Sequence, residues 1–251
     1  MAERPDVRAN VRAVLAAMAA AARGAGRDPS DVRLVAVAKG KPAPLVRAAI
    51  EAGVRIVGEN YVQEAEKKRP LVGLPAQWHF VGRLQRNKAG KAAALFDVIE
   101  SADRLDLLRT LDRIGRCRER PVPVLLEVNV AREPTKAGFL PEELPAAVEE
   151  AANLGGIRLE GLMTIGPLGA SEEEKRRVFR RLRELRDDLC RLAPLPELSM
   201  GMSDDFALAV AEGATLVRIG RAIFGPREKD PEEGGSTPCP RPGTECPASE
   251  S

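Results

Sequence analysis

The sequence predicts an α/β fold of the (β/α)8, or TIM-barrel, type with one extra helix at its N-terminus. Eight short stretches rich in Val, Ile, Leu and Ala alternate with stretches whose apolar residues recur every three or four positions, which is the pattern of β/α units. The length of 251 residues suits one large α/β domain, and 44% hydrophobic residues suffice for its core. A doubly wound open sheet is the structural alternative, although no G-x-G-x-x-G motif follows the first strand.

The chain starts with a predicted helix at residues 5–25, which two glycines end. The residues that recur there at helical spacing are Val7, Val11, Val14, Leu15, Met18 and Ala22. The first strand is predicted at residues 32–38, where five apolar residues in a row are typical of a buried strand in a parallel sheet. Gly40 and Pro42 mark the end of this strand.

Seven further strands and seven helices follow in alternation. The strands are predicted near residues 54–57, 77–82, 96–100, 122–130, 157–163, 197–200 and 215–219. The helices are predicted at residues 43–52, 61–68, 87–94, 103–117, 141–154, 171–193 and 203–212. The helix at 171–193 has the clearest pattern, because Ser171 and Glu174 fit a capping box. Its apolar stripe consists of Val178, Leu182, Leu185, Leu189 and Leu192.

Two segments of different composition divide the chain. Residues 1–225 carry the β/α alternation and are predicted to form the barrel. Residues 226–251 are rich in Pro, Gly and charged residues and contain no large aliphatic residue. Such a segment cannot bury enough apolar surface to offset the entropy of ordering it, so we expect a disordered C-terminal tail.

Composition argues against several classes of function. The net charge is +2 with acids and bases interspersed, and aromatics make up only 3%, so no nucleic-acid partner is expected. Neither a signal peptide nor an apolar run of about 18 residues is found, which predicts a cytoplasmic protein without a membrane partner. His79 is the only histidine and no C-x-x-C pair occurs, which argues against a metal site and a Ser-His-Asp triad. Cys117 and Cys190 are expected to be small, buried or half-buried side chains on helices.

Lys39 is the first candidate functional residue, because it directly follows the buried first strand. At the end of a barrel strand its stem can lie among apolar walls while its amine faces a cleft. Burial and the neighbouring cation of Lys41 both favour the neutral, nucleophilic amine. That form makes a Schiff base with an aldehyde such as pyridoxal phosphate. A lysine that merely borders the barrel is the alternative.

Two glycine-containing loops follow the last two strands at the same end of the predicted barrel. Met200-Gly201-Met202-Ser203 precedes a helix, and Gly220-Arg221-Ala222 precedes a short apolar turn. Glycines let main-chain N–H groups approach an anion closely, and Ser203 suits an N-cap. Barrels often bind phosphate between strands seven and eight, so these loops are a candidate phosphate site. In the alternative interpretation, the glycines only make turns and Ser203 only caps its helix.

Arg218 interrupts the apolar strand Leu216-Val217-Arg218-Ile219. A charge within such a run is costly unless it is paired or faces a polar cavity. An outward-facing arginine in a salt bridge would satisfy this condition. A guanidinium directed into the barrel mouth would also satisfy it, and could donate a hydrogen bond to a cofactor ring nitrogen.

Taken together, these residues resemble the pyridoxal phosphate homeostasis proteins, which are single-domain relatives of the alanine racemase barrel. Six motifs occur in the same order as in that family, between about Val32 and Gly225. They are VAVAKGKP at 35–42, GENYVQE at 58–64, WHFVG at 78–82, GLMTIG at 161–166, SMGMSDD at 199–205 and VRIGRAIFG at 217–225. Six motifs in the right order are far more specific than any one of them.

The resemblance implies a (β/α)8 barrel like the alanine racemase N-terminal domain, with pyridoxal 5′-phosphate (PLP) bound to Lys39 as a Schiff base. It implies that the loop of Met200 and Ser203 and the main chain around Gly220 and Arg221 hold the phosphate. It places Asn60 near the cofactor and Arg218 at the ring nitrogen.

In function, the resemblance implies a monomer that carries or buffers PLP without established catalysis. Such a protein would keep the free aldehyde low and maintain vitamin B6 and amino-acid and keto-acid balance. PLP-dependent apoenzymes are the acceptor partners that this function suggests.

Some residues depart from the family pattern. The family usually has Ser-Lys-Thr-Lys-Pro where this chain has Ala38-Lys39-Gly40-Lys41-Pro42, and it has a histidine where this chain has Arg83. It has a small residue at the position of Arg221, which here adds a cation beside the expected phosphate.

Two other functions are compatible with a reactive lysine. A PLP-dependent amino-acid racemase needs an acid/base group on each face of the substrate, and Tyr61 is the only tyrosine that could complement Lys39. An aldolase-like barrel for another phosphorylated metabolite would need carboxylates near Lys39, for which Glu59 and Glu127 are candidates by position.

Overall fold

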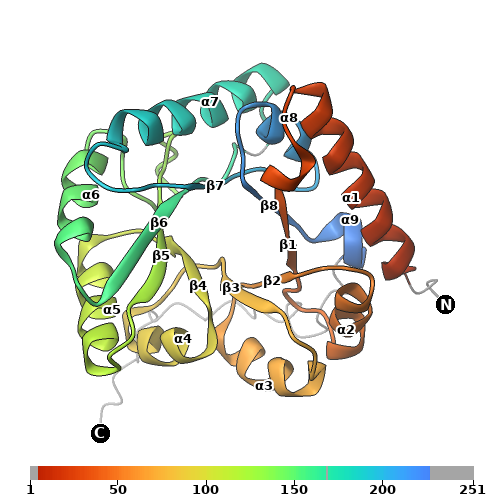
Figure 1. Ribbon diagram of the computed structural model, residues 1–251, viewed down its shortest axis with the longest axis horizontal. Helices are drawn as coiled ribbons and strands as arrows, with labels where there is room; N and C mark the ends of the chain where they lie inside the picture. The colour runs from red at the N-terminus through yellow and green to blue at the C-terminus, as the bar shows by residue number, and fades with distance from the viewer. Residues whose placement is uncertain (1–4, 168, 227–251) are drawn as a thin grey trace, which may run out of the picture.

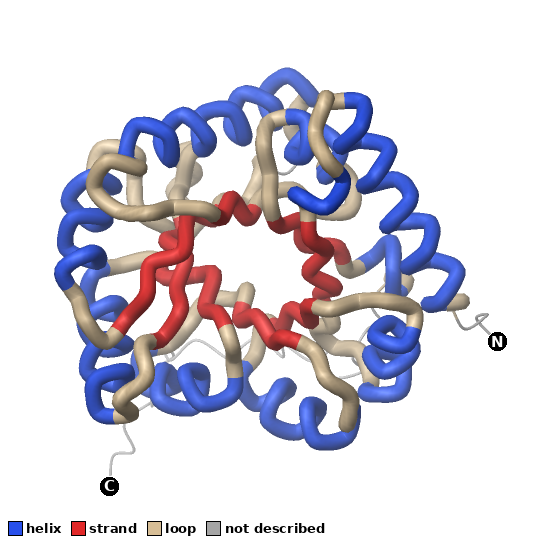
Figure 2. Tube along the Cα trace, in the orientation of Figure 1, coloured by secondary structure: helices blue, strands red, loops and turns tan. Residues whose placement is uncertain are grey.

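The computed structural model of the chain describes residues 5–167 and 169–226, and these form a closed barrel of parallel strands inside a layer of helices (Figure 1, Figure 2). The strands follow one another around the barrel in chain order, and β8 pairs with β1 to close it. The predicted (β/α)8 fold is therefore confirmed, and the open-sheet alternative is wrong. The predicted disordered tail lies outside the described residues, apart from Pro226.

Each predicted strand occurs at its expected place. The strands are β1 (Arg33–Val37), β2 (Ile56–Glu59), β3 (Gln77–Phe80), β4 (Val98–Ala102), β5 (Val122–Glu127), β6 (Ile157–Met163), β7 (Glu197–Ser199) and β8 (Leu216–Ile219). The helices are α1 (Val7–Gly24), α2 (Ala43–Glu51), α3 (Val62–Val72), α4 (Ala89–Leu95), α5 (Leu105–Cys117), α6 (Leu144–Asn153), α7 (Glu172–Leu189), α8 (Phe206–Ala211) and α9 (Arg221–Phe224). Short 3-10 turns precede β1 and α4, at Pro29–Asp31 and Arg86–Lys88.

Helix α7 is shorter than the sequence pattern predicts. Its capping box forms as predicted, since Ser171 and Glu174 bond to each other's main chain. The helix ends at Leu189, before Pro194, a residue that cannot continue a helix. Leu192 consequently lies outside the helix and is 39% exposed, whereas Phe179 is fully buried on the inner face.

The two cysteines differ from expectation. Cys117 is the last residue of α5 and Cys190 is the C-cap of α7, and both side chains are exposed. Each lies at the C-terminal end of its helix and is not among the residues of the buried face. The prediction that they are buried or half-buried is therefore wrong.

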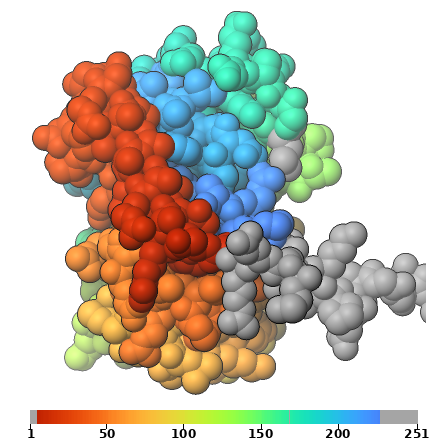
Figure 3. Space-filling model, turned by 90° about the vertical axis from the view of Figure 1, so that its right-hand side faces the viewer, coloured from red at the N-terminus to blue at the C-terminus, as the bar shows by residue number. Residues whose placement is uncertain are grey.

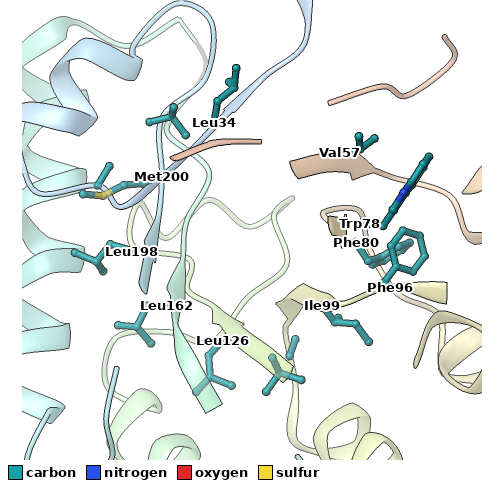
Figure 4. Packing of buried hydrophobic residues seen from close by; sticks show 14 of the residues in the cluster. Leu34, Val57, Trp78, Phe80, Phe96, Ile99, Leu126, Leu162, Leu198 and Met200 are labelled. Atoms are coloured by element: carbon teal, nitrogen blue, oxygen red, sulfur yellow. The ribbon is translucent and has the colours of Figure 1, made fainter. Parts of the chain in front are cut away.

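The apolar core has two parts. The larger part fills the space between the outer faces of the strands and the helices, and Figure 4 shows Leu34, Val57, Leu126 and Met200 within it. The smaller part lies inside the barrel and consists of Val35, Ile56, Val81, Val98, Leu125, Met163 and Leu216. Successive residues of a strand point to opposite faces, so most strands contribute to both parts, whereas β7 contributes only Leu198, to the larger part.

Helix α1 is the predicted extra helix, and it packs against α2, α8 and α9 (Figure 1). Asn10 donates a hydrogen bond from Nδ2 to the carbonyl of Ile223 at 3.0 Å, which ties α1 to the segment after β8. The space-filling view shows the first described segment, in red, lying against the last one, in blue (Figure 3). The helix thus covers the outside of the barrel where it closes. No helix in the described ranges is long and apolar enough to cross a membrane.

Candidate functional site

One cavity at the carboxyl ends of the strands collects most of the predicted site residues. Its volume is about 520 Å³. The predicted residues that line it are Lys39, Asn60, Ser203, Arg218, Gly220 and Arg221. Segments from four different places in the sequence thus converge on one space. This is the end of a (β/α)8 barrel at which active and binding sites are normally built.

Met200 is the predicted residue that the structure does not bring to this cavity. It follows β7 directly after Ser199, whose side chain points into the barrel and bonds to Arg218 and Glu100. Because side chains alternate along an extended chain, Met200 points outward and is fully buried in the core facing the helices (Figure 4). A cofactor contact of the Met200 side chain is therefore incompatible with this arrangement.

Lys39 lies on a tight turn at the end of β1. The main-chain N–H of Lys41 donates to the carbonyl of Ala38 at 3.0 Å, and Gly40 between them has φ +67°. A positive φ at the third position defines a type II turn and favours glycine there. Lys39 is half-buried, and its Nζ lies 4.7 Å from the centroid of the Tyr61 ring. The amine therefore borders the cavity, with an aromatic face beside it.

The opposite edge of the cavity is formed by the loops after β7 and β8. Gly201 has φ +89°, and a Cβ atom built there would lie 2.5 Å from the Cβ of Ala209. Only glycine fits this position without displacing α8. The Oγ of Ser203 lies 3.5 Å from the main-chain nitrogen of Ala222, which is a long contact for a hydrogen bond. Both groups therefore remain able to contact an anion in the cavity.

The carboxylates of this edge are already engaged. Arg221 is exposed and pairs with Asp204, so its charge is partly neutralised. An Oδ1 atom of Asp205 accepts the main-chain N–H of Met202 at 2.6 Å. The ion pair offsets the charge of Asp204, and it also weakens the contribution of Arg221.

Arg218 points into the barrel, which rules out the outward-facing alternative. Its Nη1 donates to Ser199 Oγ at 2.6 Å and its Nη2 donates to the carbonyl of Thr164 at 2.7 Å. Burial lowers the pKa of Arg218, and the charge of Glu100 opposes that shift. The two bonds use two of the five guanidinium donors, and Arg218 also lines the cavity.

A buried polar chain supports Arg218 from inside the barrel. Ser199 Oγ donates to Glu100, and His79 Nδ1 lies 2.6 Å from the other carboxylate oxygen of Glu100. Burial alone would raise the pKa of Glu100, but its bonds to His79 and Ser199 and the charge of Arg218 hold it below its usual value. The ionised carboxylate is thus the counter-charge of Arg218.

Neither candidate carboxylate of the aldolase alternative lines the cavity. Glu59 is fully buried and pairs with Lys68, and burial raises its pKa to about 7. Burial, together with the charge of Asp103, also raises the pKa of Glu127 to about 7. A proton donor placed away from the cavity cannot act on a ligand within it, so this alternative loses its acid/base groups.

The residue-by-residue interpretation of the sequence missed several groups of the site. Glu100 interrupts the apolar strand β4 just as Arg218 interrupts β8, so the same signal could have found it. Lys175 lines the cavity but carries no local signal, because it lies on a helix of alternating charges. Among the described residues, no group of three or more His, Cys, Asp or Glu side chains is arranged to hold a metal ion.

Comparison with known sequences identifies one family. Residues 9–228 match the family model described as the alanine racemase N-terminal domain. A pyridoxal phosphate homeostasis protein of Pseudomonas aeruginosa is 46% identical over 220 residues, which cover 87% of this chain and 95% of that relative. A pyridoxal phosphate homeostasis protein of Aquifex aeolicus is 41% identical over 218 residues, covering 86% and 96% of the two chains.

Solved structures agree with the sequence matches. PipY of Synechococcus elongatus PCC7942, whose structure has PLP bound, is 40% identical with a TM-score of 0.75, and the match covers 84% of this chain and all of that chain. Alanine racemase from Streptomyces coelicolor A3(2) is 23% identical with a TM-score of 0.68. That match covers 87% of this chain but 57% of the racemase, and it shows a shared barrel fold.

Proposed function

This chain belongs to the family of pyridoxal phosphate homeostasis proteins, and on that basis we propose that it binds PLP on Lys39 and carries or buffers the cofactor in vitamin B6 homeostasis. The observation that supports this most strongly is the convergence of Lys39, Arg218 and the loops of Ser203 and Gly220 on one cavity of about 520 Å³. The PLP-bound structure of PipY supports the choice of ligand.

The groups present fit this cofactor. PLP offers an aldehyde, a ring nitrogen and a dianionic phosphate, and each has a counterpart on the cavity wall. The amine of Lys39 suits the aldehyde, Arg218 suits the ring nitrogen, and Ser203 with the main chain at Gly220 suits the phosphate. Asp204 and Asp205 also line the cavity, and the pairing of Asp204 with Arg221 offsets part of the negative charge that a phosphate would meet there.

The bond that we propose forms at Lys39. Lys39 would hold PLP through a C=N bond between its Nζ and the aldehyde carbon, which would replace the C=O bond with release of water. Tyr61 beside Nζ and the half-buried position of Lys39 limit the water around the amine. Hydrolysis of the same bond would release the cofactor intact, which is what a carrier requires.

Arg218 favours storage over catalysis. A guanidinium keeps its protons, so a hydrogen bond from Arg218 leaves the ring nitrogen unprotonated. An unprotonated ring withdraws electrons poorly and stabilises a substrate carbanion less. The bonds of Arg218 to Ser199 and Thr164 fix the orientation of its guanidinium, which supports this proposed role.

Tyr61 gives no support to the racemase alternative. Its ring lies against the Lys39 amine and is not part of the cavity lining, and its side chain is 48% exposed. A second acid/base group is required on the face opposite Lys39, and Tyr61 lies on the same side. We therefore propose that the protein does not racemise amino acids.

We further propose a cytoplasmic monomer that delivers PLP to apoenzymes. The large exposed apolar side chains among the described residues are Tyr61, Leu71 and Leu192. Tyr61 and Leu71 lie at opposite ends of α3 and Leu192 follows α7, so they offer no continuous apolar interface. Free, exposed Cys117 and Cys190 suit a reducing compartment.

The absorption spectrum of purified protein with added PLP tests this function. We expect wild type to show the visible band of a lysine-bound cofactor and Lys39→Ala to show only free PLP. Reduction with borohydride followed by peptide mapping is expected to place the label on Lys39, with Lys41→Ala as the matched control that retains it. A label on Lys41, or an unchanged band in Lys39→Ala, would disprove the proposal.

A further inference from the structure

A charged cluster, formed by the buried Glu59 and Lys68 and the partly exposed Glu64, lies directly behind the turn that carries Lys39. Glu59 is the last residue of β2, and Glu64 and Lys68 lie one turn apart on α3. Lys68 is buried, and its Nζ donates to Ala38 O at 2.8 Å, to Glu64 Oε2 at 3.4 Å and to Glu59 Oε1. All three protons of the ammonium group therefore have acceptors.

The same cluster holds the other side of the turn. Glu64 Oε2 accepts the main-chain N–H of Gly40 at 2.8 Å. The carbonyl before Lys39 and the N–H after it are thus both fixed by side chains of α3. Tyr61, the N-cap residue of α3, also contacts the Lys39 amine. The main chain on both sides of Lys39 is fastened to one helix.

Stability alone is a weak explanation for this cluster. Burying a lysine and a carboxylate costs solvation that their attraction roughly repays, and apolar pairs of similar volume often do as well. One oxygen of Glu59 is buried and has no hydrogen-bond partner among the described residues. These charged groups supply two hydrogen bonds to the turn that an apolar pair could not make. Lys68 donates to the carbonyl of Ala38, and Glu64 accepts the N–H of Gly40.

We propose that Lys68 is a positioning residue for Lys39: held by Glu59 and Glu64, it fixes the turn at residues 38–41 so that the Lys39 amine faces the aldehyde of the bound ligand. This inference rests on the proposed function, since it concerns the covalent bond at Lys39. The phosphate edge of the cavity lies on β7 and β8 and is not touched by the cluster. Covalent attachment should therefore depend on Lys68, whereas recognition of the phosphate should not.

Two ligands separate these contributions. PLP reports on both attachment and phosphate recognition, whereas 4′-deoxypyridoxine 5′-phosphate has the same ring and phosphate but a methyl group in place of the aldehyde. For Lys68→Met we expect the affinity for PLP to fall by about tenfold, since misplacing a reacting group by a fraction of an ångström has effects of this size or larger. The affinity for the deoxy analogue should change by less than about twofold. Lys67→Met, an exposed neighbour on the same helix, is the matched control and should resemble wild type for both ligands.

Glu64 provides a second pair of variants that does not depend on the fold of Lys68→Met. Its side chain is partly exposed, so replacement is compatible with folding. Glu64→Gln keeps a carbonyl oxygen for the N–H of Gly40 and should attach PLP nearly as well as wild type. Glu64→Leu removes that acceptor and should slow attachment of PLP while leaving the analogue unaffected.

Three outcomes would overturn the inference. One is an equal loss of PLP and analogue affinity in Lys68→Met, which would mean a purely structural role. Another is PLP affinity in that variant equal to wild type, and the third is identical behaviour of Glu64→Leu and Glu64→Gln. If wild type itself fails to attach PLP, the proposed function is wrong, and that result is distinguishable from all three.

Discussion

The two edges of the cavity are built by different physical means. At the Lys39 edge, charged side chains of α3 hold a turn whose glycine has open space around it, since no atom beyond its chain neighbours lies within 4 Å of a Cβ built at Gly40. At the phosphate edge, the main chain itself is packed so closely that Gly201 cannot carry a side chain. The first edge is held by directed hydrogen bonds and the second by close packing. The difference suits their proposed tasks, because a reacting amine needs orientation whereas a phosphate is recognised by a fixed set of main-chain donors.

The largest effect is expected for Gly201→Ala at the packed edge. A Cβ there would lie 2.5 Å from the Cβ of Ala209 and 3.0 Å from the Cα of Phe206, and the residue would keep a positive φ. Overpacking and the unfavourable conformation together should cost about 2–4 kcal/mol of unfolding free energy. Thermal or urea unfolding measures this loss, and binding of PLP and of its deoxy analogue should weaken together.

Gly40→Ala is the matched comparison at the other edge. Gly40 also has a positive φ, but no atom crowds a Cβ built there. The substitution should therefore lower the unfolding free energy by only about 1 kcal/mol. Equal losses for the two variants would show that the contrast between the edges is not one of packing.

A pH-dependent effect of intermediate size is expected at Glu127, the last residue of β5. Burial raises its folded-state pKa to about 7, above its value of about 4.3 in an unfolded chain. The native state therefore holds this proton more tightly, and the native state loses stability as pH rises from about 4.5 to about 7. Glu127→Gln removes the titration, so its stability relative to wild type should be higher at pH 8 than at pH 5 by about 1–3 kcal/mol.

Urea unfolding of cofactor-free wild type and Glu127→Gln at the two pH values measures this difference. The contributions of other titrating groups to the pH dependence of stability cancel in this difference, because both proteins contain those groups. A difference that is the same at pH 5 and pH 8 would contradict the raised pKa of Glu127.

The smallest effect is expected for Arg221→Thr at the exposed rim of the phosphate edge. The extra cation favours a bound phosphate, but Arg221 is exposed and paired with Asp204. Exposed ion pairs contribute about 0–1 kcal/mol, so PLP affinity should fall by about two- to threefold at low salt. The loss should shrink further at high ionic strength. Titration of both proteins at two salt concentrations measures this, and an unchanged affinity would show that Arg221 does not contribute.

The sequence by itself determined the order of the elements and most of the residues that line the cavity and that we propose for the cofactor. Apolar runs alternating with helical periodicity placed every strand, because each β/α unit must bury one face of its strand and one stripe of its helix. Lys39, Ser203 and Gly220 could be singled out because they follow strands, and the carboxyl ends of parallel strands meet at one end of a barrel. These inferences need only the local pattern of apolar residues and the direction in which each strand runs.

Tertiary structure alone decided which way side chains face and which distant groups meet. Ser199 and Met200 are neighbours in one motif, yet one bonds to Arg218 and the other packs against the helices, because a strand alternates its faces and only the closed barrel shows which face is inside. Lys68 reaches the turn of Lys39 only because α3 packs beside the ends of β1 and β2. Contacts of this kind depend on the three-dimensional closure of the sheet, and no spacing along the chain encodes them.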